Sequence, residues 1–257
     1  MALIGSVEKV GQVLDLFTAQ QPEWGVTQVA EQLGVSKSSA HALLNTLCGV
    51  GLLRRTPEGR YQLGWRLVAL SRVLMETAPV RQAALDVMER LVRIYGETVH
   101  LAALQNGKVV YLEKLQGNRA VRVEITGVGA ELWAHASSLG KVLLSDLSQR
   151  ELLQVLQWRG MPAFTVNTIT DAEEFLQEID RVRTQGYAYD IEEYALDLCC
   201  VGAPIRNHAG VVAAISFSVP AYRFYEAKIA YRNTIVEAAH EISERLGYTE
   251  EAWKRSK

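Results

Sequence analysis

Side chains suited to contacting a nucleic acid gather between residues 25 and 64. One face of a helix expected after Ser36 carries hydroxyl, imidazole, amide and ammonium groups, which can hydrogen-bond to base edges or phosphates. Guanidinium groups follow in a short ribbon and can contact phosphates. With Thr27 and Ser36 at the starts of two helices, the candidate DNA-binding residues are Thr27, Ser36, Lys37, Ser38, Ser39, His41, Asn45, Arg54, Arg55 and Arg60.

A second polar group lies in the C-terminal half and could hold a small molecule. A helix is expected to begin at Ser137, and its first N–H groups and positive dipole end favour an anion. Alternation along residues 211–219 places Ser216 and Ser218 on one strand face, where their hydroxyls need partners. Asp190 opens an acidic cluster, and Cys200 follows in an apolar strand. The candidate small-molecule residues are Ser137, Ser138, Leu139, Gly140, Asp190, Cys200, Ser216 and Ser218.

Each of these features also has a purely structural interpretation, which stays open at this point. Ser137 can be a helix cap and nothing more. Ser216 and Ser218 can hydrogen-bond to neighbouring backbone. Cys200 can be a small buried hydrophobic residue, and the acidic cluster that begins at Asp190 can be a solvated loop.

Two other kinds of chemistry are weighed as alternatives. An enzyme with a DNA-binding appendage would use Cys200 as nucleophile, with His135 and Asp190. A metal-dependent sensor would use His135 with Asp190 or Cys200. The sequence has no nucleophile elbow, metal-spaced His/Cys pair or phosphate loop, and its five histidines are scattered. We therefore expect no enzyme, and assign no catalytic residue, metal ligand or cofactor.

Composition limits the remaining function classes. The chain has 257 residues, a formal net charge of −2 and 49% hydrophobic residues, enough for two domains with buried cores. Residues 36–66 contain five Lys and Arg residues and one Glu, so this segment is basic although the whole chain is not. The three cysteines do not have the pattern of a disulfide framework. The sequence shows neither an apolar run long enough to span a bilayer nor the pattern of a signal peptide. These observations favour a cytoplasmic protein with no membrane partner.

The N-terminal elements can position the first group of residues. Apolar spacing predicts a helix from Ser6, as its cap, to Thr18. A second helix is expected to be capped by Thr27 and ended by Gly34, and a third to be capped by Ser36 and to bury Ala40, Leu43, Leu44 and Leu47. Residues 52–55 and 60–63 flank a Thr-Pro-Glu-Gly turn and predict a two-stranded wing. A helix-turn-helix with a wing is typical of proteins that read DNA.

An apolar helix is expected next, over residues 65–78, followed by a helix over residues 80–95. The first needs a surface to cover it, which a twofold mate would provide. Packing on its own chain is the alternative.

Beyond Gly96 the pattern changes to that of strands with helices between them. Asn106-Gly107 predicts a hairpin between strands at 98–105 and 108–115. Further strands are expected at 120–125, 187–191, 199–205 and 211–219, with helices at 137–145, 149–159, 171–185 and 222–246. The predicted fold class is α+β, with an antiparallel sheet and flanking helices. The predicted domains are residues 1–64 (DNA-binding), 65–78 (linker and dimerisation helix) and 79–257 (effector-binding).

Residues from Ser36 to Leu44 with the wing, from His135 to Leu144 and from Asp190 to Pro204 resemble the IclR family of bacterial transcriptional regulators. The resemblance covers nearly the whole chain. It implies a winged helix-turn-helix, a dimerising linker helix and a GAF-like effector domain. It further implies dimers or tetramers on palindromic operators, and repression that a small metabolite relieves.

The resemblance also implies roles for the second group of residues. The N–H groups at Ser138 and Leu139 would hold the carboxylate of an organic acid or aromatic compound, and Ser216 and Ser218 would donate to its oxygens. Asp190 would repel an acid group and accept from a ligand hydroxyl instead. Two positions depart from the family. Ala42 stands where many members have arginine, and Ser138 where glycine is frequent.

Overall fold

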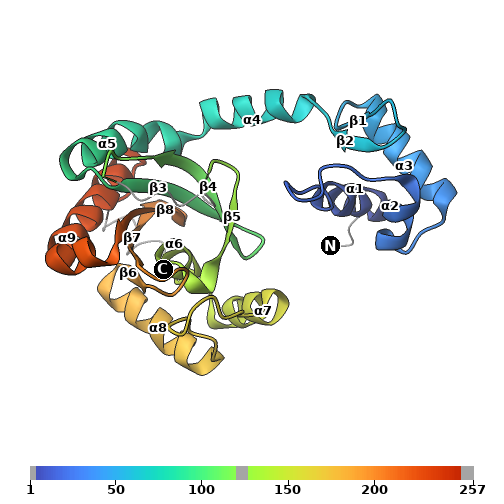
Figure 1. Cartoon of the computed structure of the whole chain (residues 1–257). Coiled ribbons are helices and arrows are strands. Elements are labelled where there is room, and N and C mark those ends of the chain that lie inside the picture. Colours follow the sequence, from blue (N-terminus) through green and yellow to red (C-terminus); the bar gives the residue numbers. More distant parts are fainter. Residues whose placement is uncertain (1–3, 120–126, 250–257) are drawn as a thin grey trace. The chain divides into compact units, whose positions relative to one another are not determined.

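The computed structural model describes residues 4–119 and 127–249, and the chain divides into two compact units, Met1–Thr77 and Ala78–Lys257. Figure 1 shows the elements of both. The strand expected over residues 120–125 lies outside the described residues.

The first unit is a small helical domain with a two-stranded wing. Its buried core joins the three helices to the wing through apolar side chains that include Val13, Val29, Leu44, Leu47 and Tyr61. Its elements are α1 (Gly5–Asp15), α2 (Val26–Leu33), α3 (Lys37–Gly49), β1 (Leu53–Arg55), β2 (Tyr61–Leu63) and α4 (Arg66–Thr77).

Two of the four helix signals predicted here are confirmed. The Ser36 hydroxyl accepts a hydrogen bond from the N–H of Ser39 and caps α3. Gly34 ends α2 with a φ of 63°, in the left-handed region that glycine adopts without strain. The turn between the two helices is therefore fixed by local chemistry.

The other two predicted caps are wrong. Helix α2 begins at Val26, so Thr27 lies inside its first turn, and Gly25 is the cap residue, with its N–H donating to Gln28 Oε1 at 3.0 Å. Helix α1 begins at Gly5 after Ile4, without a side-chain cap, and ends at Asp15. Its predicted range, from Ser6 to Thr18, was too long at the C-terminal end, because the chain there turns to place Trp24 against the wing.

The predicted wing is confirmed. Leu53 pairs with Leu63 and Arg55 with Tyr61 in an antiparallel register. The N–H of Gly59 donates to the Thr56 carbonyl at 3.0 Å and closes the turn. A backbone bridge between Trp24 and Tyr61 ties this ribbon to the segment before α2.

Helix α4 leaves its apolar side chains uncovered. None of its 12 residues is buried by any other part of the chain that the structure describes. Val73 is 58% exposed and Leu74 63% exposed. Packing against a twofold mate and packing on its own chain both stay predictions for this helix.

The second unit is a six-stranded antiparallel sheet between two layers of helices (Figure 1). The strand order is β5-β4-β3-β8-β7-β6. The strands are β3 (Thr98–Gln105), β4 (Lys108–Leu115), β5 (Glu131–Trp133), β6 (Ala188–Ile191), β7 (Leu198–Asn207) and β8 (Gly210–Pro220). The helices are α5 (Pro79–Tyr95), a 3-10 turn (Ala134–Ala136), α6 (Ser138–Leu144), α7 (Gln149–Arg159), α8 (Ala172–Gln185) and α9 (Ala221–Arg245).

Each face of the sheet has its own core. Helices α5 and α9 cover one face, with Met88, Phe217 and Phe224 among the buried side chains. Helices α6, α7 and α8 cover the other, with Leu144, Leu152 and Phe175. The α+β prediction is thereby confirmed, and so is the hairpin, whose Asn106 and Gly107 have φ of 51° and 74°. The short strand β5 was not predicted.

Candidate functional site

A small cavity, with a volume of about 30 Å³, lies in the second unit between the start of α6 and the sheet. Its lining residues are His100, Tyr111, Leu132, Ser137, Ser138, Leu139, Asp190, Tyr194, Leu198, Cys200, Ser216 and Ser218. The structure thus brings together at one cavity every residue of the candidate small-molecule group except Gly140.

Gly140 has a structural role instead. A Cβ at this position would lie 2.1 Å from the carbonyl oxygen of Ala134, so only glycine lets α6 pack against the preceding turn. Its N–H donates to the Ser137 hydroxyl at 3.1 Å, which confirms Ser137 as the cap of α6. Gly140 positions the start of the helix at the cavity.

Strand register places the polar side chains of the cavity side by side. Ser216 pairs with His100 on β3, and Ser218 pairs with Cys200 on β7. Cys200 in turn pairs with Asp190 on β6, and its thiol donates to the Ser218 hydroxyl at 3.4 Å. Four neighbouring strands therefore form the polar wall.

His100 is a buried imidazole in this wall. Its Nε2 is buried and has no hydrogen-bond partner among the described residues. The Tyr111 ring lies beside it, with centroids 4.8 Å apart. Burial lowers the pKa of His100 to about 3, so the ring is neutral at pH 7. A buried nitrogen without a partner is costly, and a ligand group can supply the missing hydrogen bond.

Asp190 is the buried acid of the cavity. Its Oδ1 accepts the N–H of Glu193 at 2.8 Å and that of Tyr194 at 3.4 Å. Burial, reinforced by the nearby Glu193 carboxylate, raises the pKa of Asp190 to about 7. The expectation that Asp190 repels an acid group and accepts from a ligand hydroxyl stays a prediction.

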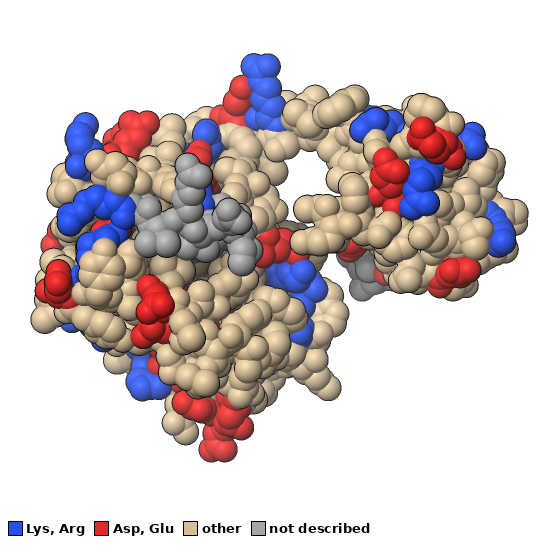
Figure 2. All heavy atoms as spheres, viewed as in Figure 1, with Lys and Arg blue, Asp and Glu red and all other residues tan. Residues whose placement is uncertain are grey.

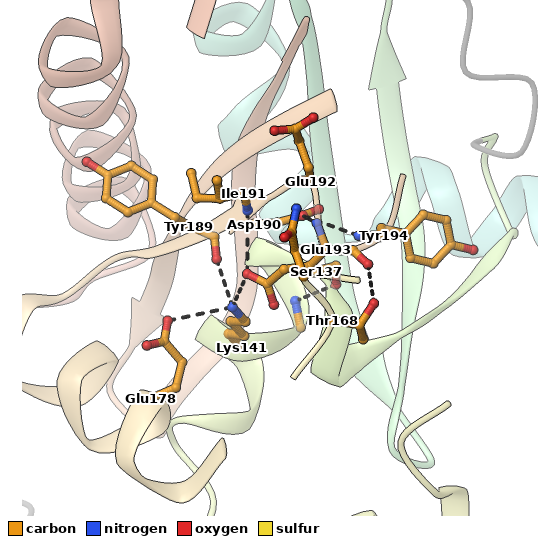
Figure 3. A network of polar contacts seen from close by, with 12 residues as sticks. Ser137, Lys141, Thr168, Glu178, Tyr189, Asp190, Ile191, Glu192, Glu193 and Tyr194 are labelled. Atoms are coloured by element: carbon orange, nitrogen blue, oxygen red, sulfur yellow. Dashed lines mark hydrogen bonds and ion pairs between the residues drawn. The ribbon is translucent and has the colours of Figure 1, made fainter. Parts of the chain in front are cut away.

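A buried ion pair supports the loop that follows Asp190 and strand β6 (Figure 3). Lys141 on α6 is 1% exposed, and its Nζ lies 2.5 Å from Glu193 Oε1 and 3.0 Å from the Tyr189 carbonyl. Glu178 on α8 lies 3.6 Å away. Thr168 donates to the Glu193 carbonyl at 2.6 Å. Helix α6 and the loop after β6, which both line the cavity, are thus held together.

The residues of the enzyme and metal-sensor alternatives do not all come together, because Asp190 and Cys200 line the cavity and His135 does not. Burial raises the pKa of the Cys200 thiol well above its usual value, which disfavours a nucleophilic thiolate. His135 Nε2 lies 3.0 Å from the Pro162 carbonyl, and its ring packs near Trp133 and Phe164. Among residues 4–119 and 127–249, no group of three His, Cys, Asp or Glu side chains could hold a metal ion.

Five lining residues were missed from the sequence: His100, Tyr111, Leu132, Tyr194 and Leu198. A histidine within an otherwise apolar strand was the one available signal for His100. Pairing between strands far apart in the sequence brings the others in, so periodicity alone could not find them.

The candidate DNA-binding residues of α3 lie on its exposed face. Lys37, Ser38, Ser39, His41 and Asn45 are exposed, whereas Ala40, Leu44 and Leu47 are buried. Leu43, expected in the buried stripe, is half-buried. The Asn45 amide lies 3.2 Å from His41 Nε2 and its Oδ1 accepts from the Tyr61 hydroxyl at 3.2 Å, which orients both polar side chains.

The arginines of the wing differ from one another. Arg54 and Arg55 are exposed, with the Arg55 guanidinium 6.0 Å from the Tyr61 ring centroid. Arg60 instead donates to the Glu23 carbonyl at 3.0 Å and to Gln28 Oε1 at 3.1 Å. Arg60 therefore ties the wing to α2. Figure 2 shows acidic and basic side chains mixed over the face in view, in keeping with a basic charge that is only local.

The chain matches two known domains along most of its length. Residues 6–57 match the IclR helix-turn-helix domain, and residues 73–244 match the C-terminal domain of the bacterial transcriptional regulator IclR. The chain belongs to the IclR family. This confirms the resemblance and makes the chain a DNA-binding transcriptional regulator with an effector-binding C-terminal domain.

Individual relatives cover the chain almost end to end. The transcriptional regulator XynR of Escherichia coli is 36% identical over 251 residues, 96% of this chain and 99% of that protein. The transcriptional repressor IclR of E. coli is 27% identical over 90% of this chain and 86% of the relative. An IclR homolog from Microbacterium hydrocarbonoxydans, solved with 4-hydroxybenzoate, is 27% identical with a TM-score of 0.76, covering 95% of this chain and 100% of that one.

These relatives confirm that this IclR-family chain is a regulator and not an enzyme. Among the described residues, no helix is both long and apolar enough to cross a membrane.

Proposed function

We propose that this regulator is a repressor whose effector is a small carboxylate, an organic or aromatic acid, bound in the cavity at the start of α6. The observation that carries the proposal is the cavity itself, which is lined by serines and by His100, whose buried Nε2 has no hydrogen-bond partner among the described residues. Such a wall favours a ligand with several oxygens over a purely apolar one. The 4-hydroxybenzoate in a relative's structure supports the same ligand class.

The carboxylate is placed by two kinds of donor. The N–H groups of Ser138 and Leu139 begin α6, where first-turn N–H groups have no partner within the helix. Ser216 and Ser218 donate to its oxygens from the sheet. The remainder of the ligand lies toward His100 and Tyr111.

DNA is held by the first unit. Ser38, Ser39, His41 and Asn45 inspect base edges, with Ser36 and Thr27 at the starts of α3 and α2. Lys37, Arg54 and Arg55 bind phosphates. Arg60 forms hydrogen bonds within the first unit, and these support a role in positioning the wing in addition to any phosphate contact.

The exposed apolar face of α4 supports a homodimer, and two dimers could pair further as a tetramer. A twofold dimer fits a palindromic operator with half-sites roughly 34 Å apart. The proposal includes a division of the chain into residues 1–64, 65–78 and 79–257. It also includes a cytoplasmic location. The effector changes DNA affinity only through its different affinity for the DNA-bound arrangement, which α4 would transmit.

Thermal unfolding with a panel of organic acids tests the ligand. A carboxylate that binds the folded state raises the melting temperature, and it should lower operator affinity in a gel-shift assay. The double variant Ser216→Ala, Ser218→Ala should lose the response. Thr184→Ala, which removes an exposed hydroxyl on α8, is the matched control and should keep it. A panel without any carboxylate response would contradict the proposal.

A further inference from the structure

We propose that the carboxylate effector is bound together with one proton, carried by Asp190, whose carboxylic acid then donates a hydrogen bond to the effector. This inference rests on the proposed function and concerns how that same cavity accepts an anion. It assigns Asp190 as a proton-carrying specificity residue for acids.

The first argument is a charge balance within the buried cluster (Figure 3). Three carboxyl groups, of Asp190, Glu193 and Glu178, surround one buried ammonium group, that of Lys141. Lys141 pairs with Glu193 at 2.5 Å and Glu178 at 3.6 Å. Glu178 also pairs with Arg181 at 2.8 Å. Asp190 is 1% exposed, and its described hydrogen bonds run to two backbone N–H groups and to the Cys200 thiol, and not to a cation.

The second argument is the lining of the cavity. None of the described residues that line it is a lysine or an arginine. An ionised Asp190 and an effector carboxylate would thus be two like charges in a desolvated site with no cation between them. One proton shared by two close carboxyl groups removes that repulsion.

The proton belongs on Oδ2. Oδ1 of Asp190 already accepts hydrogen bonds from the N–H groups of Glu193 and Tyr194. It can accept them whether the carboxyl group is ionised or neutral. A proton taken from solvent forms an O–H bond at Oδ2, and that group donates to the effector carboxylate. No covalent bond to the effector is made or broken.

Titratable groups face Asp190 from several elements. Lys141, the cation among those described, lowers the pKa of Asp190, but burial and the Glu193 carboxylate raise it further. His100 is neutral because burial lowers its pKa to about 3, and burial raises the pKa of both Tyr111 and Cys200. The groups are Glu193 and Tyr194 on the loop after β6, Lys141 on α6, His100 on β3, Tyr111 on β4, and Cys199 and Cys200 on β7. The pKa of Asp190, raised to about 7, agrees with a proton held near neutral pH.

Unfolding of the full chain without any effector gives the first test. A carboxyl with a pKa of 3.8 unfolded and about 7 folded stabilises the protein most below about pH 4, and this stabilisation is lost as pH rises to about 7. Asp190→Asn keeps an acceptor and a donor at the same place but cannot titrate. The variant should lack this loss, measured by urea unfolding at several pH values. Identical pH dependence in both proteins would overturn the inference.

Calorimetry of the wild-type full chain gives the second test. The probe is whichever of acetate, pyruvate, D-gluconate and 4-hydroxybenzoate binds most tightly, titrated in buffers of different ionisation enthalpy. Proton uptake should approach about one per bound anion above pH 8 and fall toward zero at pH 5, with affinity about tenfold lower per pH unit above the pKa of Asp190. In Asp190→Asn the affinity should not change with pH. Binding of the anion without proton uptake above pH 8 would overturn the inference alone.

The two proposals fail in different ways. If none of the four anions binds, the carboxylate effector and its proton-coupled binding are both contradicted, whereas the unfolding test still decides whether Asp190 holds a proton. If an anion binds and only the proton uptake is missing, the proposed function stands without this inference.

Discussion

Lys141 Nζ lies 2.5 Å from Oε1 of Glu193, and both side chains are buried. Lys141 belongs to the helix that begins at the cavity, and Glu193 to the loop that follows β6, the strand of Asp190. This ion pair therefore sets the separation of two cavity walls. Glu193 Oε2 has no hydrogen-bond partner among the described residues, so the carboxylate depends on Lys141 for its compensation.

Replacing Lys141 by methionine should destabilise the protein by about 3–5 kcal/mol, because it leaves a buried carboxylate without its cation. The double variant Lys141→Met, Glu193→Gln should recover part of that loss, since no uncompensated charge remains. Urea unfolding measures both. Lys108→Met, which breaks an exposed pair with Glu131, is the control and should cost no more than about 1 kcal/mol. Equal costs for the two single variants would contradict the buried-pair argument.

His100 should make the protein sensitive to acid. Its pKa falls from 6.5 unfolded to about 3 folded, so the stability it contributes is present above about pH 6.5 and is lost as pH falls toward 3. The slope is on the order of 1.4 kcal/mol per pH unit. His100→Gln should flatten the acid side of a plot of unfolding free energy against pH. His208→Gln, in an exposed turn, is the matched control.

Arg55→Ala should weaken binding to specific and random DNA alike, because a phosphate contact carries no sequence information. The slope of log affinity against log salt should decrease by about one. Fluorescence anisotropy at several salt concentrations measures it. Arg150→Ala, on the exposed face of α7, is the control and should leave the slope unchanged. An unchanged slope for Arg55→Ala would show that Arg55 does not contact a phosphate.

Arg60→Ala should instead destabilise the first unit, since it removes hydrogen bonds to Glu23 and Gln28. Each lost bond is worth about 1 kcal/mol. The measurement is the melting temperature of the full chain followed at Trp24, whose indole donates to the Leu16 carbonyl within this unit. An unchanged melting temperature with a reduced salt slope would show that Arg60 acts on phosphates and not on the wing.

Leu74→Glu on α4 should reduce the oligomer to a smaller species, because it places a charge on the apolar face proposed to meet a second copy. Sedimentation velocity measures the change, and operator affinity should fall with it. Ala69→Glu makes a similar substitution on the side that carries the Arg72–Glu76 ion pair and should preserve the oligomer. An unchanged sedimentation coefficient for Leu74→Glu would contradict dimerisation through this face.

Local signals in the sequence predicted the elements well where the chemistry is itself local. Asn106-Gly107 gave the bounds of β3 and β4 without error, since only a tight turn accepts two residues with positive φ. Ser36 was found as a cap for the same reason. The caps assigned to Ser6 and Thr27 were wrong, because the chain before α1 and α2 adopts the required conformation without a capping hydroxyl.

The candidate cavity was predicted in part. Ser216 and Ser218 stood out because two hydroxyls share one face of an apolar strand, and Asp190 because acidic residues follow a strand. His100 and Tyr111 were missed, because their place beside Ser216 follows from the order of strands β4, β3 and β8, which no local pattern encodes. Lys141 was missed because a lysine in a short helix gives no sign that it is buried.

The amino-acid sequence by itself determined the helices, the hairpin, the wing and the family, since each depends on neighbours within a few turns of chain or on similarity along it. The tertiary structure alone decided which distant side chains share the cavity and which charges are buried there. Burial is a property of the assembled layers, and it is burial that leaves His100 uncharged, raises the pKa of Asp190 and makes Lys141 the partner of Glu193.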